Sequence, residues 1–171
     1  MCDLIVLAGA PGSGKTTTMR LLRPILCSPA IDLSHLRAFH LDAAWTNATP
    51  QEEQMSFENL IALVTNYLRY GYKNIMITDL EDERVQQIPV LFAKHNYLIA
   101  TLLVREDDQL ATRVCTPTRD SGFRDVARAL AWNQSIQQRP LLSNEYRIDT
   151  TDQQPEQTAA EILRLIHRYG C

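Results

Sequence analysis

Near its N-terminus the chain reads Gly9-Ala10-Pro11-Gly12-Ser13-Gly14-Lys15-Thr16, which fits the pattern G-x-x-x-x-G-K-[ST] without a mismatch. The apolar run Leu4–Ala8 precedes it and suits a strand that is buried on both faces. Lys15 to about Leu26 then reads as a helix, which the Ser28-Pro29 break ends. The motif thus stands in a strand–loop–helix unit and predicts a phosphate-binding loop. The alternative is a chance glycine loop at such a turn.

The residue types of this loop suit a nucleotide triphosphate. Glycines let successive backbone N–H groups point inward around phosphates, and the following helix adds its positive N-terminal dipole. Lys15 is expected to reach the β- and γ-phosphates, and the Thr16 hydroxyl is the expected Mg²⁺ ligand. We therefore expect ATP with Mg²⁺ as the cofactor pair. The residues of this segment expected to contact the nucleotide are Gly9, Ala10, Pro11, Gly12, Ser13, Gly14, Lys15, Thr16 and Thr17.

Length and composition indicate one soluble globular domain spanning residues 1–171, with 45% hydrophobic residues. The net charge of −3 gives no basic field for a nucleic-acid backbone, although a local basic patch stays possible. No apolar run approaches the roughly 20 residues of a membrane span. The four cysteines are far apart, which favours free thiols over a zinc site or disulfides. We expect a cytoplasmic protein, as a monomer or homodimer.

Strands and helices alternate along the rest of the chain, which predicts a three-layer α/β fold with a parallel sheet between helices. The further expected strands are Leu36–Leu41, Asn74–Thr78, Tyr97–Val104 and Tyr146–Asp149. One further helix is expected to start at the Thr49-Pro50 cap. Four others are expected at roughly 84–95, 107–114, 125–138 and from 155 onward.

Two acids are expected at the edge where parallel sheets bind ligands, beyond the carboxyl ends of the strands. Asp42 follows the expected strand Leu36–Leu41 and is a candidate base that accepts the proton of an attacking hydroxyl. Asp79 follows the strand Asn74–Thr78 and is a candidate second Mg²⁺ contact, often through water. The alternative for Asp42 is a turn or helix-capping aspartate, and that for Asp79 is a solvated strand end.

A polar, glycine-containing loop at about 113–125 holds three arginines, namely Arg113, Arg119 and Arg124. Guanidinium groups stabilise the charge that phosphoryl transfer spreads over the γ-phosphate oxygens, and a mobile loop brings them in while excluding water. The loop therefore reads as a lid, with Arg119 and Arg124 as catalytic candidates beside Lys15 and Asp42. The alternative is a surface loop with solvated arginines.

Together these motifs resemble the small P-loop kinases, which include shikimate and gluconate kinases, chloramphenicol phosphotransferase and the kinase domain of polynucleotide kinases. Besides Gly9–Thr16, the similar segments are Leu110-Ala111-Thr112-Arg113 at the entry to the lid and Ile148-Asp149-Thr150-Thr151 before the last helix. The resemblance implies a sheet order of 2-3-1-4-5, Arg113 at the nucleotide, and an adenine bordered by the loop after the last strand. The chain departs from the family in having Ala43-Ala44 after Asp42, and no dense double-arginine motif in its lid.

Three functions stay open. The first is a kinase that moves the γ-phosphate of ATP to a hydroxyl of a metabolite, a nucleoside or an antibiotic. The second is a polynucleotide 5′-hydroxyl kinase, against which the acidic net charge counts. The third is a regulatory ATPase whose bound nucleotide orders a loop for a protein partner.

Overall fold

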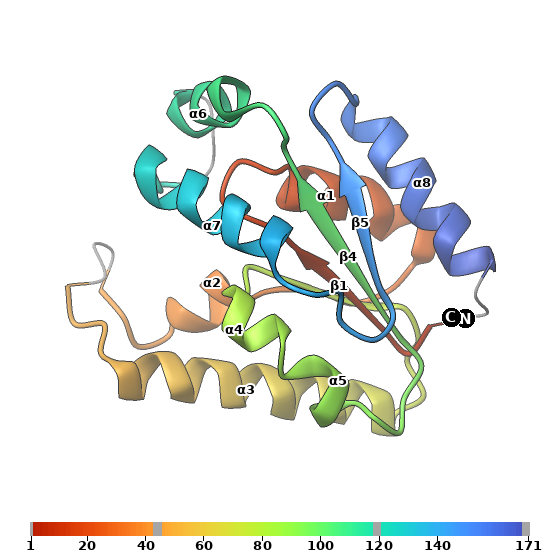
Figure 1. Ribbon diagram of the computed structural model, residues 1–171. Helices are drawn as coiled ribbons and strands as arrows, with labels where there is room; N and C mark the ends of the chain where they lie inside the picture. Colours follow the sequence, from red (N-terminus) through yellow and green to blue (C-terminus); the bar gives the residue numbers. More distant parts are fainter. Residues whose placement is uncertain (1, 43–45, 118–120, 169–171) are drawn as a thin grey trace.

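The computed structural model describes residues 2–42, 46–117 and 121–168. It confirms the α/β class and the strand order, because five parallel strands form one sheet in the order β2-β3-β1-β4-β5 (Figure 1). The strands are β1 (Leu4–Ala8), β2 (Ala30–Asp32), β3 (Ile75–Thr78), β4 (Tyr97–Leu103) and β5 (Glu145–Asp149).

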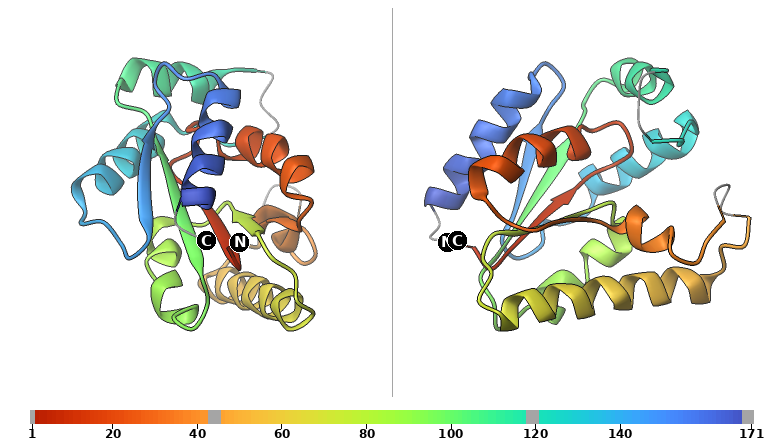
Figure 2. Two further views of the ribbon diagram at one scale, coloured as in Figure 1. Left: turned by 90° about the vertical axis from the view of Figure 1, so that its right-hand side faces the viewer. Right: turned by 180° about the vertical axis from the view of Figure 1, so that it is seen from behind.

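Helices cover both faces of this sheet, which makes three layers (Figure 2). Helices α1 and α8 lie on one face and α3, α4 and α5 on the other, while α6 and α7 follow the carboxyl end of β4. No helix in the described ranges combines the length and the apolar composition that a membrane span needs. The helices are α1 (Lys15–Leu26), α2 (Leu33–Arg37), α3 (Pro50–Arg69), α4 (Asp82–Val85), α5 (Ile88–Leu91), α6 (Asp107–Cys115), α7 (Val126–Gln138) and α8 (Pro155–Arg168).

The central strand β1 is buried on both faces, as its apolar run predicts. Leu4 and Val6 pack in the cluster formed with α3, whereas Ile5 and Leu7 pack in the cluster formed with α1 and α8. Successive side chains of a strand point to opposite faces, so one uninterrupted apolar run supplies both cores. The carboxyl end of β1, where the phosphate loop begins, is thereby held in the middle of the sheet.

The helix cap expected at Thr49 is confirmed, because the Thr49 side chain accepts a hydrogen bond from the backbone N–H of Glu52. Pro50 stands in the first turn of α3, where its missing N–H costs no helical hydrogen bond. This capped start also fixes the position of Glu53, which is in the same first turn of α3 and lies at the sheet edge that carries the ligand-binding candidates.

The strand expected at Leu36–Leu41 was wrong. The second strand is the three-residue β2 (Ala30–Asp32), and the chain then turns at once into the short helix α2. Asp32 caps this helix by accepting a hydrogen bond from the Ser34 N–H at 3.0 Å. A three-residue run is too short to show a period, and the buried side chain of Leu41 belongs to the turns after α2.

The single helix expected at roughly 84–95 is two short ones, α4 and α5. Pro89 explains the division, since it lacks an N–H group and so occupies the first turn of α5 instead of a helix interior. The remaining expected strands and helices agree with the structure to within about two residues.

Candidate functional site

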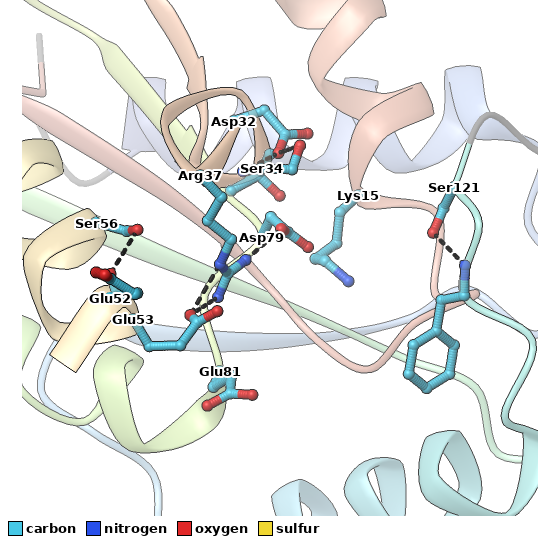
Figure 3. A network of polar contacts seen from close by, with 12 residues as sticks. Lys15, Asp32, Ser34, Arg37, Glu52, Glu53, Ser56, Asp79, Glu81 and Ser121 are labelled. Carbon is cyan, nitrogen blue, oxygen red and sulfur yellow. Dashed lines mark hydrogen bonds and ion pairs between the residues drawn. The ribbon is translucent and has the colours of Figure 1, made fainter. Parts of the chain in front are cut away.

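The phosphate loop spans the turn between β1 and α1. The Lys15 ammonium donates hydrogen bonds to the backbone oxygens of Gly9 at 2.8 Å and Ala10 at 3.0 Å, so its head lies over the loop (Figure 3). The Ser13 hydroxyl is fully buried and has no hydrogen-bond partner. A buried polar atom without a partner indicates a site that a ligand or water completes.

Two glycines of the loop are required by its shape. Gly9 has φ +130°, and a Cβ there would lie 2.3 Å from the backbone oxygen of Leu102. Gly12 has φ +91°, and its Cβ would lie 2.9 Å from a methyl carbon of Leu110 in α6. Both conformations favour glycine, and both sites lack room for a side chain. The loop is therefore clamped between β4 and α6 in the curled form that phosphate binding needs.

Asp79 follows β3 directly, as expected, and lies beside the phosphate loop. Its backbone is in the left-handed region with φ +66°, which aspartate tolerates better than most residues. Its carboxylate lies between Arg37 and Lys15 in Figure 3. Its side chain is 42% exposed, so solvent reaches the carboxylate.

Arg37 at the end of α2 binds two carboxylates from distant parts of the chain. Its Nη1 donates to Asp79 at 2.9 Å, and its Nε and Nη2 donate to Glu53 at 2.8 and 2.6 Å. The Arg37 side chain is only 8% exposed. We call these three residues the Arg37 group; they join α2, α3 and the end of β3 into one polar wall beside the phosphate loop (Figure 3).

Electrostatics connects this group to the loop. Burial raises the pKa of Asp79 above its ordinary value, and the Asp32 carboxylate adds to the rise, while Lys15 and Arg37 oppose it. Asp32, Asp79 and Lys15 are therefore close enough to interact electrostatically, as their positions in Figure 3 also show. A carboxylate with a raised pKa beside a lysine of the phosphate loop is a candidate for proton or cation chemistry.

The acid at the carboxyl end of the second strand is Asp32, and it was missed from the sequence. Its side chain is buried, and its Oδ1 accepts hydrogen bonds from the N–H of Ser34 at 3.0 Å and from the hydroxyl of Ser34 at 2.6 Å. The signal was present in Ala30-Ile31-Asp32, a short apolar run closed by an acid, which is the pattern that identified Asp79.

Asp42 does not occupy the place for which it was chosen. It is exposed, in a loop nine residues beyond the start of α2, and accepts hydrogen bonds from the N–H and the hydroxyl of Thr46. Its own N–H donates to the side-chain oxygen of Asn47 at 2.9 Å. The expected strand before Asp42 is absent, and the hydrogen bonds of Asp42 are those of a turn aspartate. The role of Asp42 as a base stays a prediction.

Arg113 lies on the last turn of α6, and its contact with the nucleotide stays a prediction. Its guanidinium donates to the backbone oxygens of Thr150 at 2.7 Å and Thr151 at 2.8 Å, in the loop after β5. The Thr150 hydroxyl in turn donates to the backbone oxygen of Ser13 at 3.1 Å. Burial lowers the pKa of Arg113, against the opposing charges of Asp152 and Asp149. This chain of contacts links the start of the expected lid, the last loop and the phosphate loop.

The other lid arginines are less informative. Arg124 is exposed, and its Nη1 donates to the backbone oxygens of Phe123 at 2.9 Å and of Ser121. Arg119 lies outside the described residues. Both stay predictions as catalytic groups, and Figure 3 shows Ser121, from the same segment, across Lys15 from the Arg37 group.

The donors around the loop suit Mg²⁺. Thr16, half-buried in the first turn of α1, offers a hydroxyl oxygen, and Asp79 offers a carboxylate on the same side as Lys15. Hard oxygen ligands supplemented by water are the usual coordination of Mg²⁺ beside phosphates. No group of three or more His, Cys, Asp and Glu side chains able to hold a metal occurs in the described part of the chain.

Comparisons with known proteins agree with this architecture. No protein-family model and no curated protein sequence matches the chain. A sugar kinase from Janibacter sp. HTCC2649 is similar, with a TM-score of 0.70 and 14% identity over 99% of this chain and 96% of that one. A gluconokinase from Sinorhizobium meliloti 1021 gives 0.69 and 13% over 96% and 91%, and a shikimate kinase from Bacteroides thetaiotaomicron gives 0.67 and 17% over 96% and 98%.

At such low identities the likeness concerns the fold. With its phosphate loop after β1 and its sheet order of β2-β3-β1-β4-β5, the chain has the fold of the P-loop kinases.

Proposed function

We propose that this protein transfers the γ-phosphate of ATP to a hydroxyl group of a small molecule. The observation that carries the proposal is the position of two carboxylates, Asp32 and Asp79, at the ends of β2 and β3, in one space with Lys15. A protein that only binds the nucleotide needs no more than the phosphate loop. Carboxylates that face this loop are useful where an acceptor binds whose hydroxyl must lose a proton.

In the proposed step the acceptor oxygen attacks the γ-phosphorus. A new oxygen–phosphorus bond forms while the bond from the γ-phosphorus to the β–γ bridging oxygen breaks, and that electron pair leaves with ADP. The acceptor proton passes to the Asp32 carboxylate, which the Ser34 bonds hold in place through Oδ1. Asp32 thus takes the role first expected of Asp42.

The other residues bind and orient the nucleotide. Lys15 would exchange its loop carbonyls for the β- and γ-phosphate oxygens. Thr16 and Asp79 would hold Mg²⁺, which neutralises phosphate charge when bound. Arg113 would border the base through the loop at Thr150. Arg119 and Arg124 stay proposals for stabilising charge on the γ-phosphate.

The test pairs Asp32→Asn with Asp42→Asn, and Lys15→Met reports on nucleotide binding. ATP-dependent thermal shift and transfer of labelled γ-phosphate to a panel of sugars, polyols, nucleosides and amino sugars would be measured for each variant. Asparagine still caps α2 well, so Asp32→Asn should fold and bind ATP while transfer falls roughly 10²–10⁴-fold. Asp42→Asn should transfer within about twofold of the wild type, because surface substitutions outside a site have small effects.

Lys15→Met should lose most of the ATP-dependent stabilisation, which is about 2.7 kcal/mol at a hundredfold excess over the dissociation constant. An unchanged thermal shift in that variant would contradict the assigned phosphate loop. Normal transfer in Asp32→Asn together with a defect in Asp42→Asn would return the base to Asp42. Full ATP binding without transfer to any compound would favour the regulatory ATPase.

A further inference from the structure

The Arg37 group bears on which acceptor this site accepts, an inference that rests on the proposed phosphate transfer. Arg37 is the buried cation of the wall that faces the phosphate loop. Each of its three guanidinium nitrogens donates to a carboxylate, Nη1 to Asp79 and both Nε and Nη2 to Glu53. To bind this arginine, an anionic acceptor would have to displace a carboxylate whose oxygen already lies 2.6–2.9 Å from a guanidinium nitrogen.

The charge of the wall also disfavours anions. The carboxylates of Asp32, Glu53 and Asp79 interact within one space, and Arg37 is the guanidinium set among them. Lys15, the other cation that acts on Asp79 among the described residues, is the phosphate ligand of the nucleotide in the proposed function. With Mg²⁺ on Asp79, as proposed above, the carboxylates of Asp32 and Glu53 face the single guanidinium of Arg37. The acceptor side therefore keeps an excess of negative charge, and a like charge placed against it is repelled.

Arginines on the neighbouring elements have partners of their own. The Arg84 guanidinium lies 4.9 Å from the ring centre of Phe57, and Arg128 pairs with Glu81 at 3.3 Å. The two arginines are thus in contact with Phe57 and Glu81, and among the described residues neither forms an ion pair with the three carboxylates of the wall. In the part of the chain that the structure describes, the elements around Asp79 thus supply carboxylates in excess of cations.

We infer that the phosphate acceptor is a hydroxyl compound without a carboxylate or phosphate group, and that a protonated amine on it improves binding. Amino sugars and amino alcohols belong to this class, as do uncharged polyols. Gluconate and shikimate, after which two of the similar structures are named, are carboxylates and should be poor acceptors here. Arg37 is a positioning residue in this arrangement, because it acts by holding Glu53 and Asp79.

The experiment compares acceptors that share a carbon skeleton but differ in the charge of one substituent. Glucose, glucosamine and gluconate form one set, and a nucleoside with its 5′-monophosphate and its 5′-amino derivative forms another. With ATP and Mg²⁺ held constant, transfer efficiency should be at least about tenfold higher for the uncharged and amine members than for the anionic ones. This comparison uses the wild-type protein and does not depend on how any variant folds.

A variant then tests whether the Arg37 group causes the selectivity. Glu53→Gln keeps an oxygen that accepts from Arg37 but removes the charge, so the preference against anions should fall by about tenfold. The matched control is Glu58→Gln on the exposed side of α3, where the carboxylate accepts from Gln54, and it should keep the wild-type preference. Melting temperatures establish that both variants are folded.

Each outcome bears on a separate claim. Absence of an ATP-dependent thermal shift would overturn the proposed function itself. If ATP binds, equal or better transfer to the anionic members would overturn the inferred acceptor class, and so would failure of every uncharged and amine-bearing member. A Glu53→Gln variant with unchanged preference would remove the Arg37 group as the cause.

Discussion

The phosphate loop and the Arg37 group lie on the same edge of the sheet, but they are built in opposite ways. The loop is a contiguous segment, Gly9–Thr16, and it works mainly through backbone geometry. The Arg37 group comes from α2, α3 and the end of β3, so residues 42 positions apart meet through side chains alone. A contiguous backbone motif leaves a pattern in the sequence, whereas a dispersed side-chain group leaves none.

The two regions also differ in what the bound ligand must replace. The Lys15 ammonium donates to two neutral backbone oxygens, and water can replace it as their hydrogen-bond donor if Lys15 turns to a ligand. Arg37 rests on two carboxylates, which stay charged if it leaves. Lys15 can therefore exchange its hydrogen-bond partners at low cost. The Arg37 group is held together by its ion pairs, and breaking them leaves unpaired charges.

The largest effect is expected from breaking the second region. Arg37→Met should lower the free energy of unfolding by about 3 kcal/mol, because it removes the ion-pair partner of Glu53 and one of the two cations that act on Asp79. The value is at the low end for a broken ion pair, since these carboxylates are 32% and 42% exposed. Urea unfolding measures it, and the size of the ATP-dependent shift should be kept.

Arg128→Met is the matched control for that prediction. Its pair with Glu81 is exposed, at 60% and 49% for the two side chains, so the loss should stay below about 1 kcal/mol. Equal losses in the two variants would mean that the Arg37 group is an ordinary surface cluster.

A smaller effect is expected from Gly9→Ala in the first region. A methyl group there meets the Leu102 backbone oxygen at 2.3 Å and the backbone has φ +130°, so we expect a loss of roughly 2 kcal/mol and weakened ATP binding. Gly71→Ala isolates the conformational part, because φ is +81° but no atom lies within 4 Å of the added carbon. It should lose about 1 kcal/mol and bind ATP normally. Equal losses of stability in Gly9→Ala and Gly71→Ala would show that the backbone around Gly9 moves to accommodate the added methyl group.

The smallest effect is a contrast in pH dependence between Asp79 of the Arg37 group and Asp149, an acid outside both regions. Burial raises the folded-state pKa of Asp79 above its ordinary value of 3.8, so this group costs stability as pH rises from 3.8 through the raised pKa. For Asp149, at the end of β5, burial acts in the same direction, but hydrogen bonds from Thr151 outweigh it and lower the pKa below 3.8. Asp149 therefore contributes stability that is lost as pH falls through its folded pKa.

The measurement is the unfolding free energy of wild type, Asp79→Asn and Asp149→Asn between about pH 3 and 7. Relative to wild type, Asp79→Asn should become more stable as pH rises above 3.8. Asp149→Asn should become less stable as pH rises toward and past 3.8 from below. Parallel curves for the two variants would contradict the assignment of opposite shifts.

Sequence reasoning succeeded where the signal was long or local. The uninterrupted apolar run Leu4–Ala8, the motif Gly9–Thr16 and the Thr49 cap each depend on neighbouring residues, and each is confirmed as structure. It failed at β2, because three residues carry no period and the apolar side chains at 36–41 imitated a strand. Because of that one error, the acid expected at the end of the second strand was Asp42 and not Asp32.

The sequence by itself therefore determined the phosphate loop, the parallel α/β sheet and the acid Asp79 beside that loop, because backbone conformation and strand burial follow from residues close together in the chain. Only the tertiary structure decided which second acid shares this space and what surrounds it. Asp32 reaches the edge through the early end of β2, and Arg37 meets Glu53 and Asp79 only after α2 and α3 have packed beside the sheet. Ion pairs between distant elements depend on packing, and no local pattern records them.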